Sequence, residues 1–207
     1  ALEKIKTLSF FEENILPNIF LPDLMAIDSW DEATNTINYN EDNFSIESDS
    51  WNEMPSSQDS YRVFMSKLEL SQNPTTGFIT ISVKHQSPFI AKEWTEMVVN
   101  EVNYFFRTKD KIEAQKAMDF LNMQISLTSF TEIKQVIAQI LQQKMEQLTL
   151  IEANEYYVFS FIDPPAVMEE KVEPRRSSIS ILGAVLGLML GILVVILRQY
   201  FSSGKSS

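Results

Sequence analysis

The chain has 207 residues and a formal net charge of -11, from 17 lysines and arginines against 28 aspartates and glutamates. A chain this acidic has no basic stripe that would release counterions from nucleic acid, and anionic lipid headgroups repel it. We therefore expect no nucleic-acid binding and one ordinary domain that stands off the bilayer. The absence of cysteine excludes disulfides and thiolate metal sites.

The N-terminal residues predict short helices. Apolar residues recur at Leu2, Ile5 and Leu8, and Pro17 and Pro22 interrupt the pattern. The chain begins without an initiator methionine or a signal peptide. We expect that a first transmembrane helix is missing upstream.

A polar segment and a hairpin follow. Residues 31–60 are rich in acidic side chains, which predicts a solvated loop with a strand at Thr36–Tyr39. Asn73–Gly77 is a turn, because Pro74 fixes one dihedral and Gly77 supplies a positive one. The flanking residues, Leu68–Leu70 and Phe78–Val83, are predicted to pair as a β-hairpin with one buried face.

One long helix is predicted over residues 88–127. Neither glycine nor a further proline occurs between Pro88 and Asp163, and Ser87-Pro88 is typical of a helix start. Its first half carries an apolar stripe, whereas residues 107–116 are mostly charged. Forty helical residues extend about 60 Å, so the charged middle should leave the body of the domain.

A second helix is predicted over residues 129–151, because Ser129 and Glu132 have capping-box spacing. Tyr156–Ile162 is rich in β-forming residues and predicts a last strand, which Pro164-Pro165 would end. The apolar stripe of the second helix consists of Ile133, Ile137, Ile140, Leu141, Leu148 and Ile151.

The C-terminal segment predicts a membrane anchor. Residues 179–197 are apolar apart from Ser180 and lie between Arg175-Arg176 and Arg198. At about 1.5 Å per residue they extend roughly 28 Å, close to the thickness of a bilayer's hydrocarbon core. Residues 163–178 are a stiff linker and residues 198–207 a short cytoplasmic tail. The linker contains Pro164, Pro165 and Pro174, and the span contains Gly183, Gly187 and Gly191 at four-residue intervals, a pattern that lets another helix approach closely.

The predicted fold class is therefore α+β. Residues 1–162 form a membrane-proximal α/β body from which a long helical hairpin projects, and a C-terminal transmembrane helix follows.

The sequence gives little indication of a catalytic site. The single histidine, His85, is at a predicted strand end and is interpreted as structural rather than as a general base. No G-x-S-x-G or H-E-x-x-H motif occurs, and Ser203-Gly-Lys-Ser206 lacks the upstream glycine of a phosphate-binding loop. We therefore expect no enzyme activity, no metal and no cofactor.

Several segments of the chain form a recognisable set: Gly77–Pro88, Ala91, Trp94, Asn103, Arg107, Asp110, Glu113-Ala114, Phe159, Ile162–Pro164, Lys171, Pro174–Arg176 and the three glycines of the span. Together they resemble the polysaccharide co-polymerase (chain-length determinant, Wzz) family. The resemblance covers nearly the whole chain, and the proline-rich linker and the glycine ladder (Gly183, Gly187 and Gly191) are its most specific part. Two departures are the missing first transmembrane helix and Met168, where the family commonly has proline.

The resemblance implies a bacterial inner-membrane protein whose main domain is periplasmic. It also implies a homo-oligomer that regulates the chain length of O-antigen-type lipopolysaccharide together with a membrane glycan polymerase and its lipid-linked polysaccharide. On the projecting helix, Lys109, Lys111 and Glu113 are the candidates for length modulation.

Two alternatives stay open. One is an exporter-type co-polymerase for capsular polysaccharide or exopolysaccharide that is linked to a tyrosine kinase. A fused kinase would need a long cytoplasmic tail, and about ten residues follow the predicted span. The other is a membrane-anchored periplasmic sensor domain, which would need a cytoplasmic output module.

Overall fold

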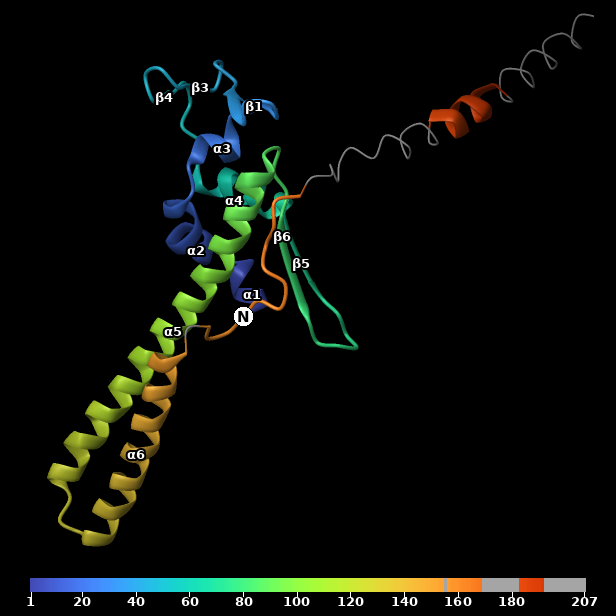
Figure 1. Ribbon diagram of the computed structural model, residues 1–207. Helices are drawn as coiled ribbons and strands as arrows, with labels where there is room; N and C mark the ends of the chain where they lie inside the picture. The colour runs from blue at the N-terminus through green and yellow to red at the C-terminus, as the bar shows by residue number, and fades with distance from the viewer. Residues whose placement is uncertain (155, 169–182, 192–207) are drawn as a thin grey trace, which may run out of the picture. The chain divides into compact units, whose positions relative to one another are not determined.

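The computed structural model describes residues 1–154, 156–168 and 183–191 (Figure 1). The chain divides into two compact units, Ala1–Val167 and Met168–Ser207. The first unit is α+β, as predicted, and combines three two-stranded antiparallel sheets with a long helical hairpin.

The N-terminal part of the first unit is a series of short helical turns. Pro17 and Pro22 divide them, because proline has no N–H to continue a helix but fits its first turn. The turns are α1 (Leu2–Ile5), α2 (Leu8–Phe10), the π-helical turn η1 (Phe11–Ile15), the 3-10 turn η2 (Leu16–Asn18) and α3 (Leu21–Met25).

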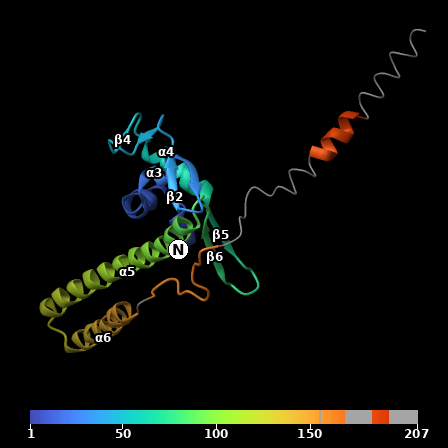
Figure 2. The ribbon, with the colours of Figure 1, turned by 45° about the horizontal axis from the view of Figure 1, so that its top comes forward.

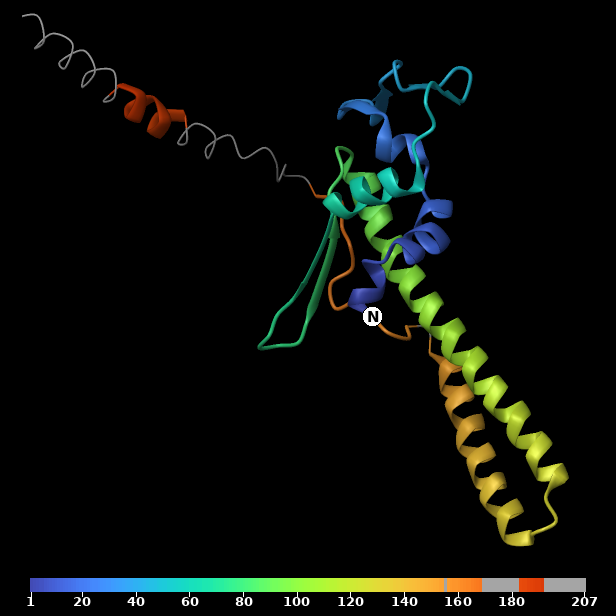
Figure 3. The same ribbon diagram turned by 180° about the vertical axis from the view of Figure 1, so that it is seen from behind.

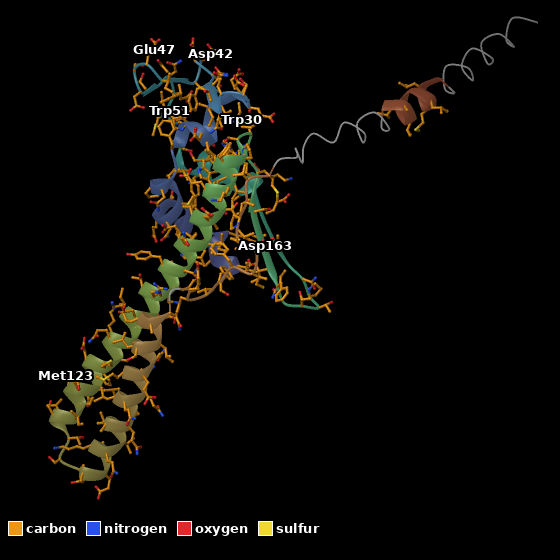
Figure 4. All side chains as sticks on the ribbon, viewed as in Figure 1. Trp30, Asp42, Glu47, Trp51, Met123 and Asp163 are labelled. Atoms are coloured by element: carbon orange, nitrogen blue, oxygen red, sulfur yellow. The ribbon has the colours of Figure 1, made fainter. Side chains whose placement is uncertain are left out.

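The acidic stretch after α3 is more ordered than the sequence predicts. It forms two small hairpins, β1 (Ile27–Asp31) with β2 (Thr36–Tyr39) and β3 (Phe44–Ser45) with β4 (Ser50–Trp51). Asn35 and Asp49 adopt positive φ in the two turns, a conformation that Asn and Asp tolerate. A chain of ring contacts holds the hairpins together through Phe20, Tyr39, Phe44 and Trp51. Figure 4 shows Asp42 and Glu47 on the outer loops of this region.

Helix α4 (Ser57–Lys67) leads directly into the predicted hairpin of β5 (Leu68–Gln72) and β6 (Ile79–Val83). The register pairs Leu68 with Val83 and Leu70 with Ile81, which places these apolar side chains against the core. Gly77 has a φ of 75°, the positive dihedral that the turn requires.

Helix α5 spans Pro88–Leu127, and α6 spans Thr131–Ala153. The two helices lie side by side in Figures 1 and 2, and α5 runs from the body into the hairpin. The predicted capping box at Ser129 is wrong: Phe130, whose side chain cannot accept a hydrogen bond, occupies the N-cap of α6.

The core of the first unit gathers around the first half of α5. Trp94, Val98 and Val102 are buried at helical spacing against Phe10 and Phe64, among others. Each such side chain contributes about 1.5–3 kcal/mol on burial.

Beyond the core, the hairpin has only a narrow buried seam of Ala114, Met118, Ile137 and Ile151. Of the six residues predicted as the stripe of α6, only Ile137 and Ile151 are buried. Leu141 and Leu148 are half-buried, and Ile133 and Ile140 are exposed, because α6 packs mainly against α5.

The predicted last strand is wrong. Residues 156–162 run as irregular backbone, and Val158 and Phe159 pack against the core. We call residue 154 and residues 156–162 the return segment; Figure 3 shows its path between α1 and the β5–β6 hairpin.

Of the second unit, the structure describes Met168 and residues 183–191, and the latter are helical. Most of the predicted span 179–197 lies outside the described residues. Within residues 1–154, 156–168 and 183–191, no helix is both long enough and apolar enough to cross a bilayer.

Candidate functional site

The candidate site is the seam between α5 and the return segment. Asn103, Arg107 and Asp110 lie on one face of α5, because residues three, four and seven apart share a helix face. Each of them binds the return segment. The seam therefore joins the body, the hairpin and the segment that leads toward the predicted linker.

Asn103 is the buried centre of the seam. Its Nδ2 donates to the carbonyl of Phe159 at 2.9 Å, and its Oδ1 accepts from the N–H of Phe159 at 2.9 Å and of Val158 at 2.8 Å. One amide side chain thereby satisfies backbone groups that a neighbouring strand would otherwise bind. This contact is the physical reason why the return segment is not a strand.

Two further contacts hold the outer part of the return segment. Arg107 donates to the carbonyl of Asn154, and the hydroxyl of Tyr157 donates to Oδ2 of Asp110 at 2.6 Å. The hydrogen bond to Asp110, with a smaller effect of burial, raises the pKa of Tyr157 to about 12. Tyr157 therefore remains a hydrogen-bond donor throughout the physiological pH range.

An open groove lies beside this seam. Helix α5 lines it with Glu96, Asn100, Asn103, Tyr104 and Arg107, and the return segment lines it with Tyr156 and Phe161. Tyr104 is 63% exposed, and Tyr156 makes an edge-to-face contact with Phe161 at 5.9 Å between ring centroids. The groove therefore combines aromatic surfaces with amide, carboxylate and guanidinium groups.

His85 links two distant parts of the body. The N–H of Ser87 donates to its Nδ1 at 3.0 Å, so Nε2 carries the proton and donates to the carbonyl of Asp23 at 2.9 Å. The ring also contacts Trp94 edge to face. Burial is the largest cause that lowers the pKa of His85 below its usual value of 6.5, and Lys67 adds to it. This arrangement fits the structural role predicted for His85.

The three candidates for length modulation lie on the exposed middle of α5. Lys109 and Glu113 form a surface ion pair at 3.8 Å, and Lys111 pairs with Glu152 of α6. The structure thus brings Lys111 to the hairpin seam, whereas Lys109 and Glu113 pair along α5. Surface ion pairs of this kind contribute little to stability.

The linker and ladder residues are described in part. Gly183, Gly187 and Gly191 lie in the helical residues 183–191, and a Cβ added at any of them would meet no described atom within 4 Å. Pro164 and Pro165 are described in irregular backbone, and Pro174 lies outside the described residues. In the described part of the chain, acidic and histidine side chains form no group that could hold a metal ion.

The fold of the first unit places the protein in the class of α+β bodies that carry a long antiparallel helical hairpin. Residues 124–200 match the family model GNVR, described as a G-rich domain on putative tyrosine kinase. This match supports the broader resemblance to polysaccharide co-polymerases and does not single out the Wzz branch. No curated protein matches the chain significantly.

The sequence did not predict the hydrogen bonds of Asn103 to the return segment or the hydrogen bond of Tyr157 to Asp110. The available signal was one amide at position 103, directly after Val102 in an otherwise apolar stretch of α5. A buried amide predicts that a polar partner lies opposite, but it does not identify that partner.

Proposed function

We propose that this protein is a non-catalytic regulator of polysaccharide chain length of the O-antigen lipopolysaccharide type. It acts as a homo-oligomeric co-polymerase of the bacterial inner membrane, with its main domain in the periplasm. Its partners are a membrane glycan polymerase and the lipid-linked polysaccharide. The observation that carries the proposal is the α5–α6 hairpin, of which the end of α5 and the whole of α6 fall within the GNVR match.

Exposed apolar side chains on the hairpin support the homo-oligomer. A hairpin of two helices leaves most of each helix uncovered, and large exposed apolar patches mark contact surfaces. Packing protomers side by side would cover them with one repeated interface. Figure 4 shows Met123 on this part of α5. The exposed large apolar residues at this end of the hairpin are Phe120, Met123, Leu127, Phe130, Ile133 and Val136.

The membrane anchor is the second element of the proposal. In this proposal residues 179–197 span the membrane, and Gly183, Gly187 and Gly191 form a packing face toward another membrane helix, a neighbouring protomer or the polymerase. Pro164, Pro165 and Pro174 stiffen the linker that lifts the body from the bilayer.

A second candidate is the exporter-type co-polymerase that works with a tyrosine kinase. The description of the matching family, which names a putative tyrosine kinase, favours it. In that case the protein would control secreted capsular polysaccharide or exopolysaccharide, and it would become phosphorylated or bind a kinase.

One experiment separates the candidates. The gene is deleted and restored in its host, and lipopolysaccharide, secreted polysaccharide and phosphotyrosine are examined on gels. Loss of the modal length of lipopolysaccharide alone supports the regulator of the O-antigen type. Loss of secreted polymer together with phosphotyrosine supports the exporter. Unchanged profiles of both polymers contradict the co-polymerase function.

A further inference from the structure

We propose that the groove between α5 and the return segment binds a short stretch of uncharged glycan. The groove is the one lined by Glu96, Asn100, Asn103, Tyr104 and Arg107 of α5 and by Tyr156 and Phe161 of the return segment. The inference rests on the proposed function, because it names a site where such a protein would contact the growing polymer.

The aromatic side chains are the first observation. Tyr104 and Tyr156 are 63% and 44% exposed. The C–H face of a sugar ring stacks on such surfaces, and tyrosine adds a hydroxyl at the rim. Phe161 supports the ring of Tyr156 by an edge-to-face contact with an interplanar angle of 83°.

The polar groups are the second observation. Asn100 is an exposed amide, and Glu96 offers carboxylate oxygens, so donors and acceptors for sugar hydroxyls line the same helix face as Tyr104. A few polar groups among aromatic surfaces are typical of small-molecule sites.

Charge selects the kind of glycan. Lys92 pairs with Glu96 at 3.1 Å, and Arg107 already donates to the carbonyl of Asn154. The cationic groups near the groove therefore have partners within the chain. A polyanionic sugar would have to compete with Glu96 for Lys92 and would meet the carboxylate of Glu96, so an uncharged segment fits better.

Rigidity is the third observation. One wall is part of α5, whose opposite face is anchored in the core by Trp94 and Val98. Asn103 holds the other wall through backbone groups of Val158 and Phe159, and Tyr157 binds Asp110. Walls that are fixed before binding reduce the entropy lost when a ligand binds.

The test uses the full chain in mild detergent and saturation-transfer difference NMR. The probe is polysaccharide from the host, freed of its lipid by mild acid, and the polyanion polygalacturonate is the comparison. We expect the host polysaccharide to bind, and Tyr104→Ala to weaken its binding about tenfold, since an exposed tyrosine can dominate such a contact. Tyr104→Phe should retain most of the binding because it keeps the ring.

Phe89→Ala is the matched control, because Phe89 is also an exposed aromatic residue of α5 but lies outside the groove and outside the exposed apolar end of the hairpin. It should bind the polysaccharide as the wild type does. Circular dichroism verifies that Tyr104→Ala is folded, and Asn100→Leu, at another exposed position of the groove, gives a second variant that should also lose binding.

Three results would overturn the proposal: no binding to the wild type, equal binding by Tyr104→Ala and the wild type, or equally strong binding of polygalacturonate. A changed oligomer mass of Tyr104→Ala with unchanged glycan binding would assign the groove to a contact between protomers instead. The deletion experiment tests the proposed function separately. If the deletion alters polymer length but the groove binds no glycan, only the proposed glycan site is refuted. If the groove binds glycan but the deletion leaves polymer length unchanged, only the proposed function is refuted.

Discussion

Asn103 binds both polar groups of the backbone of Phe159, with its Nδ2 on the carbonyl and its Oδ1 on the N–H, each at 2.9 Å. This pair of bonds joins residues 56 positions apart and replaces the strand pairing that the sequence of the return segment favours. It fixes where the chain leaves the hairpin and turns toward the predicted linker.

We expect Asn103→Ala to lower the free energy of unfolding by about 3 kcal/mol, because it removes three partly buried hydrogen bonds of about 1 kcal/mol each. Urea denaturation followed by tryptophan fluorescence measures the change. Asn100→Ala, one turn away and exposed, is the control and should change the free energy by less than about 0.5 kcal/mol.

Asn103→Asp sharpens this test. It keeps an acceptor for the N–H groups of Val158 and Phe159 but places a carboxylate oxygen against the carbonyl of Phe159, so it should also be destabilising at neutral pH. If both variants unfold at the urea concentration of the wild type, Asn103 does not hold the return segment.

The contrast between α5 and the return segment shows what a sequence reveals. Ser87-Pro88 and the absence of glycine and proline over the following residues predict α5, because these signals act within a few residues. The β-forming residues of Tyr156–Ile162 gave the wrong prediction, because the partner of that backbone is a side chain far upstream.

The candidate site follows the same rule. The helical spacing of Asn103, Arg107 and Asp110 is visible in the sequence, so a common face could be predicted. Their partners are Phe159, Asn154 and Tyr157, and only tertiary packing brings these to α5. His85 is similar, since its ring reaches the carbonyl of Asp23, 62 residues away.

We expect stability to fall as the pH decreases below about 6.5, because of His85. Burial lowers the pKa of His85 in the folded protein below its usual value of 6.5, so the unfolded chain binds the proton more tightly. The contribution is fully present above pH 6.5 and is lost as the pH falls through the folded pKa, at no more than about 1.4 kcal/mol per pH unit.

Melting temperatures between pH 5 and pH 7.5 measure this effect, with His85→Gln as the comparison. His85 is the only histidine of the chain, so the difference between the two pH profiles isolates its titration. The groups near the ring that carry charge are Lys67 and Asp23. Parallel profiles of the wild type and the variant would show that His85 titrates alike in the folded and unfolded states.

Charge changes on the exposed middle of α5 should shift the modal polymer length and leave the fold intact. Lys109→Ala, Lys111→Ala and Glu113→Ala each remove one member of an exposed ion pair, which should change the free energy of unfolding by less than about 0.5 kcal/mol. Gels of polysaccharide from complemented deletion cells measure the length. An exchange of Lys109 and Glu113 preserves the pair and is the matched control; if all these variants give the wild-type distribution, this part of α5 does not set polymer length.

Gly187→Leu should weaken packing of the predicted membrane helix and impair length control. A Cβ at Gly187 would meet no described atom of the chain within 4 Å, so the substitution should act on a partner helix outside the described residues. Helices in lipid associate through close backbone contact and dispersion, which a leucine on the glycine face prevents.

Crosslinking in membranes measures the helix packing, and gels of the polymer measure length control. The melting temperature of the body should stay unchanged. Val185→Phe adds bulk about 160° away on the helix, on the face opposite Gly187, and is the control. The triple variant Gly183→Leu, Gly187→Leu and Gly191→Leu gives the contradicting outcome. If it is expressed normally and still shows normal crosslinking and normal polymer length, the three glycines have no role in helix packing.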